Sequence, residues 1–276
     1  MVDPGLEISI SQQCEIAGLS RSSFYYEPVE KITPQEIEVM HAIDRIYTEY
    51  PFFGHRRIYD ELKEQGFEIG RDRTLDYMQE MGLVPFYPKR KKNTSLPNKE
   101  HAVYPYLLKD LKIARSNQVW AADITYVPLD GRFCYLVAII DWFSRLILSY
   151  RICNCLDVQF CLEAFDEASQ RFGHPEIFNT DQGSQFTSQD FVNRLLSKNI
   201  RPSMDSKGRA IDNVIIERFF RTLKYEDIYL KRYGSINELK QGIRQYIEFY
   251  NRRRRHSSLN NKTPFHAYYG QQISLN

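Results

Sequence analysis

Residues 119–152 read VWAADITYVPLDGRFCYLVAIIDWFSRLILSYRI, and this stretch decides the fold. Apolar, β-branched and aromatic residues dominate three segments that short polar turns separate: 119–127, 133–140 and 146–152. Runs of this length between turn residues are typical of strands. The stretch therefore predicts three consecutive strands joined as hairpins.

Beyond residue 152 the pattern changes to alternating helices and strands. The expected helices cover 157–172 and 188–198, and the expected short strands cover 176–180 and 200–204. Hairpins followed by alternating helix and strand favour a mixed sheet with flanking helices. We therefore expect an α/β fold with a five-stranded sheet in this part of the chain.

The first 85 residues, by contrast, predict only helices. Residues 11–26 form two short helical segments that break at Gly18-Leu19, with Ser20 as the N-cap of the second. Helix, glycine-containing turn and helix is the outline of a helix-turn-helix, although the same outline occurs in hairpins that bind no DNA.

A second helical group follows within residues 31–85. The spacing of apolar side chains, with glycines as stops, predicts three helices: 34–49, 55–65 and 71–81. Four side chains would lie toward the outer face of the last helix, where they could enter a DNA groove or simply be solvated: Arg71, Arg73, Thr74 and Tyr77.

Residues 86–115 have the composition of a linker. They contain prolines and a run of four basic residues, which indicates a boundary between domains. The run supplies further candidate DNA contacts: Lys89, Arg90, Lys91 and Lys92.

Charge is distributed unevenly along the chain. The net charge is +2, but counting Lys and Arg against Asp and Glu gives −8 for residues 1–85, +6 for 86–116, −4 for 117–206 and +8 for 207–276. Basic blocks are often solvated surface or linker. Here two of them flank an acidic segment with candidate metal ligands, which favours binding of nucleic-acid phosphates.

Length and composition exclude several classes of protein. A chain of 276 residues with 42% hydrophobic residues can bury a sizeable core. The longest apolar runs, such as 133–140, are too short to span a bilayer, and no secretory signal is visible at the N-terminus. Five cysteines without a C-x-x-C pair favour reduced thiols in a cytoplasmic protein.

Asp123 is the first of three carboxylates that indicate chemistry. It lies in the middle of an apolar strand, on the same face as Ala121 and Thr125. An unpaired buried charge costs on the order of several kcal/mol, so this carboxylate needs an arginine, backbone donors or a metal ion. The small Ala121 leaves room beside it, which favours the metal ion.

Asp181 is the second carboxylate, at the end of the strand predicted for 176–180. It opens a loop with a glycine at Gly183. Sites form at the carboxyl ends of strands in open α/β sheets, although an aspartate in this place is also a common turn or cap residue.

Glu217 is the third carboxylate, and 35 residues separate it from the loop aspartate. Its helix is expected to start after Asp212 or Asn213 as N-cap. Around that helix Arg221 lies roughly 40° and Lys224 roughly 20° from Glu217, so one face carries all three. The face is either a surface Glu–Arg pair, or it places Glu217 on a metal ion and Lys224 on a phosphate.

Two further acids compete for the third place in this set. We assign Asp205 to a flexible Ser-Lys-Gly loop and Asp212 to the helix cap. Oxygen ligands from distant acids suit Mg²⁺ or Mn²⁺, and two such ions can clamp the attacking and leaving oxygens of a phosphodiester substitution. The sequence therefore predicts a catalytic metal site with three ligands: Asp123, Asp181 and Glu217.

Three motifs contain these residues: WAADITYV (120–127), NTDQGSQF (179–186) and DNVIIERFFRTLKYE (212–226). Together they resemble the retroviral-integrase-type DDE core of bacterial insertion-sequence transposases, in particular the OrfB product of the "IS-three" family. The tail YNRRRRHSSLNNKTPFHAYYG (250–270) resembles the terminal motif of that group, and residues 35–85 resemble its accessory helix-turn-helix. The resemblance covers nearly the whole chain, but the chain lacks the N-terminal His/Cys zinc cluster of retroviral integrases.

The resemblance implies an RNase H-like fold and two Mg²⁺ (or Mn²⁺) ions held by the three acids. It implies cleavage that frees a 3′-OH at the element's ends, strand transfer into target DNA, and copy-out, paste-in transposition through a joined-end circle. The implied partners are double-stranded DNA, further copies of the chain on that DNA, and an upstream OrfA product. Lys224 and Arg221 would hold the DNA end, and four tail residues would grip its backbone: Arg252, Arg253, Arg254 and Arg255.

The expected organisation has five segments. These are a helix-turn-helix-like segment (1–30), a helical DNA-binding domain (31–85), the basic linker (86–115), the RNase H-like core (116–230) and a C-terminal helix with basic tail (231–276). Two alternatives to a transposase stay open at this point. A DNA-binding regulator with an inactive core would bind DNA without metal-dependent chemistry, and a plain RNase H-like nuclease would cleave DNA without preference for the element's ends.

Overall fold

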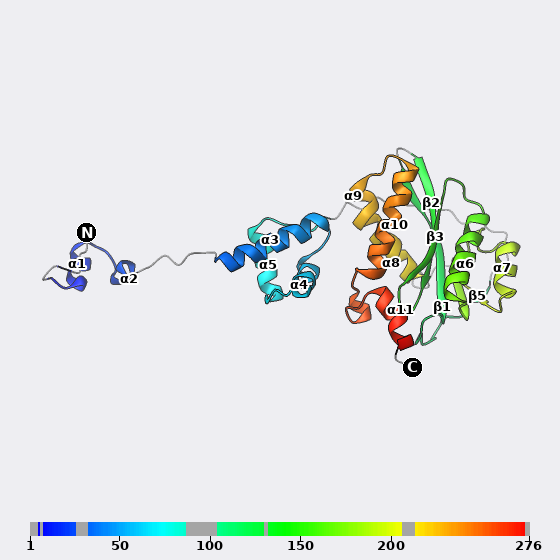
Figure 1. Ribbon diagram of the computed structural model, residues 1–276, viewed down its shortest axis with the longest axis horizontal. Helices are drawn as coiled ribbons and strands as arrows, with labels where there is room; N and C mark the ends of the chain where they lie inside the picture. Colours follow the sequence, from blue (N-terminus) through cyan, green and yellow to red (C-terminus); the bar gives the residue numbers. More distant parts are fainter. Residues whose placement is uncertain are drawn as a thin grey trace. The chain divides into compact units, whose positions relative to one another are not determined.

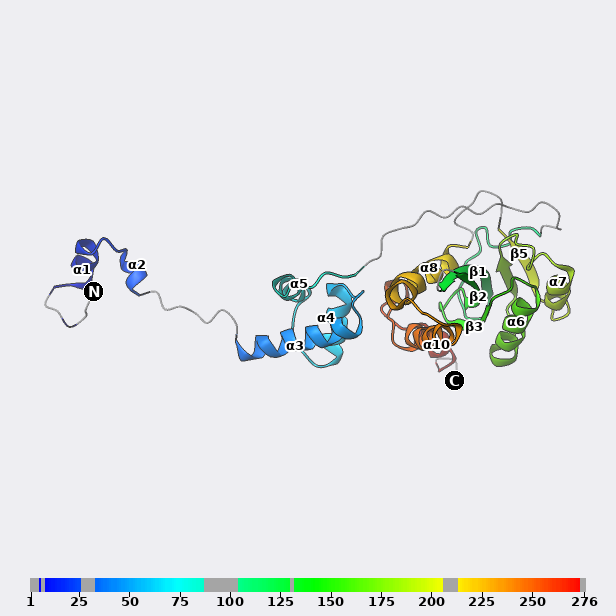
Figure 2. The same cartoon turned by 90° about the horizontal axis from the view of Figure 1, so that it is seen from above.

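A computed structural model of the chain describes residues 5, 8–25, 33–86, 104–129, 132–205 and 213–273. The chain divides into two compact units, Met1–Phe86 and Tyr87–Asn276 (Figures 1 and 2). No helix in the described ranges is both long and apolar enough to cross a membrane. The basic linker residues predicted to contact DNA lie outside the described residues: Lys89, Arg90, Lys91 and Lys92.

The first unit begins with the two short helices α1 (Ile10–Ile16) and α2 (Arg21–Phe24). The chain reverses between them at Gly18, whose φ of 64° is a left-handed conformation that glycine adopts without strain. The hydroxyl of Ser20 accepts a hydrogen bond from the backbone N–H of Ser23 at 3.2 Å, which confirms Ser20 as the N-cap of α2.

Three further helices follow in this unit: α3 (Pro34–Glu49), α4 (His55–Glu64) and α5 (Arg71–Glu80). Their bounds agree with the predicted ones to within one residue. Thr33 and Glu36 form a capping box at the start of α3, and the Glu36 carboxylate also accepts hydrogen bonds from Arg73 and Tyr77 of α5 at 2.7 Å each. Hydrogen bonds from the Thr33 backbone, from Tyr77 and from Arg73 lower the pKa of Glu36 to about 2. Glu36 therefore fastens α3 to α5.

The second unit contains a mixed five-stranded sheet in the order β3-β2-β1-β4-β5. The strands are β1 (Val119–Leu129), β2 (Arg132–Asp141), β3 (Ile147–Cys153), β4 (Ile177–Thr180) and β5 (Arg201–Met204). β1, β2 and β3 pair antiparallel, whereas β4 and β5 run parallel to β1. All five predicted strands are present. The antiparallel strands β1 to β3 and the parallel strands β4 and β5 join at β1, which pairs with β2 on one side and with β4 on the other.

Helices cover both faces of this sheet. Figure 1 shows α6 (Gln159–Phe172) and α7 (Gln189–Leu196) on one side, with α8 (Val214–Leu223) and α10 (Ile236–Arg252) on the other. Side chains alternate along β1, so that Trp120 packs into the apolar cluster containing α6 and α7, and Ala121 packs into the one containing α8 and α10. Asp123 and Thr125 therefore belong to the α8 face of β1.

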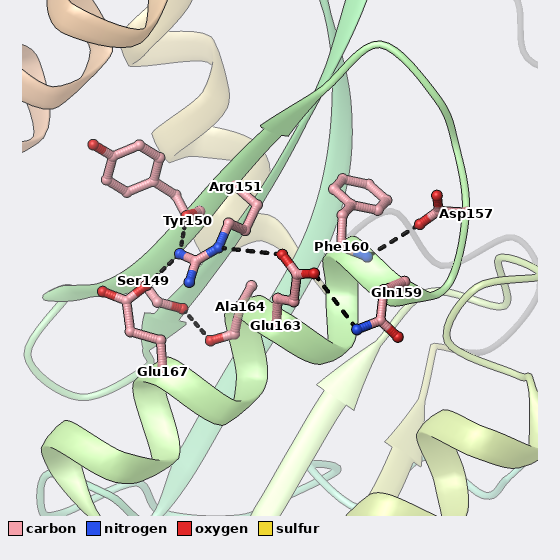
Figure 3. A network of polar contacts seen from close by, with 9 residues as sticks. All are labelled: Ser149, Tyr150, Arg151, Asp157, Gln159, Phe160, Glu163, Ala164 and Glu167. Carbon is pink, nitrogen blue, oxygen red and sulfur yellow. Dashed lines mark hydrogen bonds and ion pairs between the residues drawn. The ribbon is translucent and has the colours of Figure 1, made fainter.

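Polar contacts fasten the edge strand β3 to α6 (Figure 3). The Ser149 hydroxyl donates to the carbonyl of Ala164 at 2.6 Å, and the Arg151 guanidinium pairs with Glu167 and lies 3.8 Å from Glu163. The helix itself starts with a hydrogen bond from the Phe160 backbone to the Asp157 carboxylate at 3.1 Å. β3 and α6 thus hold each other in place at the edge of the sheet.

The chain after α8 winds as a π-helical turn, η1 (Lys224–Ile228), followed by α9 (Tyr229–Lys231), α10, a 3-10 turn, η2 (Ser257–Leu259), and α11 (Pro264–Ile273). The buried Asp227 carboxylate in the π turn accepts hydrogen bonds from Lys231 and Tyr233 at 2.6 Å each. At the end of α10 the Asn251 amide binds both backbone groups of Ile147 at 2.9 and 3.0 Å. Asn251 thus joins α10 to β3.

Candidate active site

Asp123 lies half-buried in the middle of β1, on the face that α8 covers. One carboxylate oxygen accepts a hydrogen bond from the backbone N–H of Ile124 at 2.7 Å. Burial raises the pKa of Asp123 well above its ordinary value, and the negative charges of Asp181, Glu217 and Asp205 raise it further. No arginine compensates this carboxylate, because the charges that act on it most strongly among the described residues are other carboxylates.

Asp181 follows β4 directly, and the parallel pairing explains why it lies near Asp123. Ala121 of β1 pairs with Asn179 of β4, so continuing both strands by two residues brings Asp123 level with Asp181. Neighbouring strands lie about 4.8 Å apart. The Asp181 carboxylate accepts a hydrogen bond from the backbone N–H of Gly183 at 3.0 Å, and burial raises its pKa.

Asp205 continues the same row, which the sequence analysis did not predict. Thr180 pairs with Met204 of β5, and the N–H of Asp205 donates to the carbonyl of Thr180 at 3.0 Å. Its carboxylate accepts a hydrogen bond from the Asn179 side chain at 2.8 Å. These two hydrogen bonds fix Asp205 directly after β5, whereas the Ser-Lys-Gly loop to which it was assigned lies outside the described residues. Its position directly after the strand predicted for 200–204 was the signal that could have identified it.

Glu217 comes from the first turn of α8 and is exposed, and partial burial of its carboxyl group raises its pKa. The helix begins after Asn213, at one of the two predicted positions, but without a side-chain cap. The Asn213 amide oxygen is buried and accepts no hydrogen bond from the described part of the chain. Asp212, the other predicted cap, lies outside the described residues.

Lys224 places a cation near Asp123. Its ammonium group donates a hydrogen bond to the Thr125 hydroxyl at 2.6 Å, two residues from Asp123 on the same face of β1. Burial lowers the pKa of Lys224, and the negative charge of Asp123 opposes that shift. Arg221, which was predicted on the same helix face, is exposed, and its guanidinium lies 5.8 Å from the centre of the Tyr225 ring.

The donor set fits a divalent cation, although it is not closed into a coordination shell. Within the described residues no three His, Cys, Asp or Glu side chains are arranged to hold a metal ion. The acids are nonetheless close enough for Asp181, Glu217 and Asp205 to raise the pKa of Asp123. A group of hard oxygen donors that repel one another in this way is what Mg²⁺ or Mn²⁺ would stabilise.

Comparisons with known proteins agree with this geometry. Residues 114–210 and 198–264 match integrase core domain families, and residues 34–91 match an HTH-like domain family. The chain is 32% identical to the putative transposase InsK of insertion sequence element IS150 from Escherichia coli (strain K12), over 90% of this chain and 89% of the relative. The chain belongs to the insertion-sequence transposase family.

Other relatives support the same family. Transposase InsF of insertion sequence IS3A from Escherichia coli (strain K12) is 31% identical over 91% of both chains. A chain in the structure of the simian T-cell lymphotropic virus intasome in complex with PP2A regulatory subunit B56 gamma is similar in fold, with a TM-score of 0.50 and 16% identity over 82% of this chain and 74% of that chain. The transposase is thus an enzyme of the DDE transposase and integrase class, with an RNase H-like core after an HTH-like region.

The arginine run in the tail of the transposase does not form one exposed DNA-binding face. Arg252 pairs with Glu248 at 2.7 Å and lies over the Phe265 ring, while Arg253 is exposed. Arg255 donates to the carbonyl of Asn261 at 3.1 Å. These three side chains remain candidates for contact with DNA.

Arg254 corrects the prediction made for this run. Its side chain is only 10% exposed, and it binds both carboxylate oxygens of the buried Glu226 at 2.8 and 2.9 Å. The Tyr246 hydroxyl donates to the same carboxylate at 2.7 Å. Arg254 therefore stabilises the π turn that carries Lys224 and cannot reach a DNA backbone.

The HTH-like region also differs from prediction in two side chains. Thr74 and Tyr77, expected on the outer face of α5, are buried within the first unit. Arg73 pairs with Glu36 at 2.7 Å, and its guanidinium lies 4.4 Å from the centre of the Tyr77 ring. The exposed Arg71 lies over the Tyr59 ring at 5.2 Å. Helical spacing alone had not shown which side of α5 faces α3.

Proposed function

We propose that Asp123, Asp181 and Glu217 are the catalytic metal ligands of this transposase. One observation carries the proposal: the parallel register brings Asp123 level with Asp181. Burial raises the pKa of Asp123, and the negative charges of Asp181 and Glu217 raise it further. Mg²⁺ or Mn²⁺, two ions per site, would supply an activated 3′-OH or water and neutralise charge on the reacting phosphate.

The residues of the chain have separate tasks in this proposal. The three carboxylates bind and orient the divalent cations from two strands and one helix. Lys224, held by Thr125, places a positive charge beside Asp123 and binds a phosphate of the DNA end. Gly183 donates its N–H to Asp181 and fixes the orientation of that carboxylate. Rigid elements thus position each group before substrate arrives.

The reaction is cleavage at the ends of the insertion sequence to free a 3′-OH, followed by attack of that 3′-OH on a phosphodiester of target DNA. The HTH-like region would recognise the element's ends. Two ends must react together, so the active species is an assembly of at least two copies on DNA, with an upstream OrfA product as a further partner. Its place of action is the bacterial cytoplasm.

Strand transfer on DNA that carries the terminal inverted repeats, with Mg²⁺ or Mn²⁺, tests the proposal. The wild-type protein should produce joined products, and Asp181→Asn and Glu217→Gln should abolish them while leaving DNA binding intact. Activity that survives either substitution would overturn the assigned roles. DNA binding without metal-dependent chemistry in the wild-type protein would instead support a regulator with an inactive core.

A further inference from the structure

A cavity of ≈ 970 Å³ lies in the second unit, and none of the acids of the candidate active site lines it. Its walls come from the residues before β1, the turn between β2 and β3, the η2 turn and α11. The lining carries four basic or titratable side chains and two aromatic rings, without any Asp or Glu: Arg115, Arg145, Lys262, His266, Trp142 and Phe143.

The turn between β2 and β3 forms a fixed wall of this cavity. The Asp141 carboxylate, fully buried, accepts hydrogen bonds from the N–H and hydroxyl of Ser144 at 2.8 and 2.6 Å and from the N–H of Asn117 at 2.8 Å. The N–H of Trp142 donates to the carbonyl of Val119 at 2.9 Å. These bonds hold the turn, and with it the Trp142 ring, against the start of β1.

The opposite wall is a short hairpin that is equally well fastened. The N–H of His256 donates to the carbonyl of Lys262 at 3.1 Å, and the N–H of Asn261 donates to the carbonyl of His256 at 3.0 Å. The Arg255 guanidinium donates to the carbonyl of Asn261 at 3.1 Å. Lys262 is therefore presented at the cavity from a rigid loop.

Arg145 is the side chain of this cavity that an anion would stabilise most. Its side chain is half-buried, and its guanidinium donates to the carbonyl of Trp142 at 2.5 Å. No carboxylate in the described ranges lies within ion-pair distance of Arg145 or of Lys262, whereas Arg115 pairs with Glu176. Burial lowers the pKa of Arg145. A partly buried cation that has a carbonyl partner but no carboxylate within ion-pair distance in the described ranges is stabilised when an anion binds beside it.

We propose that this cavity is a second DNA-contact site, in which Arg145 and Lys262 bind phosphates and Trp142 stacks against a base. Its volume is at the upper limit for a small-molecule site. Its exposed rim carries Lys262 and His266 beside Arg115, which pairs with Glu176, and such a rim suits a strand that continues beyond the cavity. The proposal rests on the function proposed above, which makes DNA the substrate.

The site is separate from the acids. The carbonyl of Val119 binds Trp142, and Asp123 lies four residues further along β1, which corresponds to about 13 Å. DNA in the cavity would therefore be a different segment from the phosphodiester at the acids, or the same strand several nucleotides away.

The salt dependence of DNA binding tests this inference in the full-length protein. A plot of log K against log[salt] has a negative slope, and Lys262→Gln and Arg145→Asn should each make that slope less steep, by about 0.9 for duplex DNA or about 0.7 for a single strand. Asparagine is chosen because residue 145 has a φ of 66°, which asparagine tolerates. Lys240→Gln, an exposed lysine of α10 outside the cavity, is the matched control and should leave the slope unchanged. Equal slopes for all four proteins would overturn the inference.

Tryptophan fluorescence gives an independent readout. The chain has two tryptophans, and Trp120 is fully buried, so DNA should quench the emission of Trp142, and Trp142→Phe should remove the quenching. If a nucleoside monophosphate quenches the emission to the same extent and at the same concentration as an oligonucleotide, the cavity is a nucleotide site. That result would contradict the inference. A wild-type protein that binds DNA but never cleaves it would count against the proposed function, whereas unchanged slopes in a cleaving protein count against this site alone.

Discussion

Replacing Arg254 by alanine is expected to destabilise the second unit far more than replacing its exposed neighbour Arg252. Arg254 and Glu226 are 10% and 9% exposed and are joined by two hydrogen bonds, so the substitution leaves a buried carboxylate without its charged partner. Breaking a buried pair from one side costs about 3–5 kcal/mol. The Tyr246 hydroxyl can stay on Glu226, but it cannot neutralise the charge.

Arg252 offers a matched control because it also pairs with a glutamate. Its side chain is 56% exposed, and its partner Glu248 is 67% exposed. An exposed pair of this spacing contributes about 0.3–0.5 kcal/mol, and the contact with the Phe265 ring adds about 0.5–1 kcal/mol. Arg252→Ala should therefore lower the free energy of unfolding by about 1 kcal/mol, and the larger loss expected for Arg254→Ala comes from the burial of its ion pair.

Thermal and urea unfolding of the wild-type protein and both variants measure this difference. About 3–5 kcal/mol corresponds to a decrease in Tm of roughly 6–20 °C for a domain of this size. A double variant with Glu226→Gln and Arg254→Met should recover much of the loss, because neither buried group then carries a charge. Equal destabilisation by Arg254→Ala and Arg252→Ala would refute the structural role of Arg254 and restore it as a candidate DNA contact.

Three further predictions concern the candidate active site. Asp123→Asn should stabilise the metal-free protein at pH 7. Because the pKa of Asp123 is raised in the folded state, the free energy of unfolding of the wild-type protein should fall as pH rises from about 4 toward that pKa. If the free energies of unfolding of the two proteins differ by the same amount at every pH between 4 and 7, this prediction is wrong. Gly183→Ala places a Cβ 2.9 Å from an Asp181 carboxylate oxygen, so strand transfer should fall roughly 10- to 100-fold at nearly unchanged Tm; full activity would show that this carboxylate need not stay fixed. Lys224→Gln should make the negative slope of log K against log[salt] less steep by about 0.9 when the protein binds DNA of the element's end. An unchanged slope would show that Lys224 does not bind a phosphate.

The fold could be predicted from the sequence because its signals are local. Alternating and continuous apolar runs defined the strands around Asp123 and Asp181, and Ser20 and Gly18 defined the break between α1 and α2. The three acids were found for a related reason. Asp123 stands in an apolar strand and Asp181 at the end of one, while Glu217 was proposed from its spacing and from the helix face that it shares with Arg221 and Lys224.

The remaining features depend on contacts between residues that are distant in sequence. Asp205 joins the acids only because β5 lies beside β4, a neighbour relation that spacing does not encode. Arg254 looks like any member of a basic run until Glu226, 28 residues away, is seen to pair with it. Tyr77 is buried because α5 turns that side toward Glu36. In each case the sequence gives the charge and helical or strand position of the side chain, but its contacts depend on tertiary packing.

Metal binding to the three acids is the most direct test of the central claim. Titration of the metal-free protein with Mn²⁺, followed by calorimetry and by the electron paramagnetic resonance signal of free Mn²⁺, should show binding that Asp181→Asn and Glu217→Gln each weaken strongly. Asp190→Asn, which alters an exposed acid at the start of α7, should bind Mn²⁺ like the wild-type protein. Wild-type Mn²⁺ affinity in Asp181→Asn or Glu217→Gln would contradict the account.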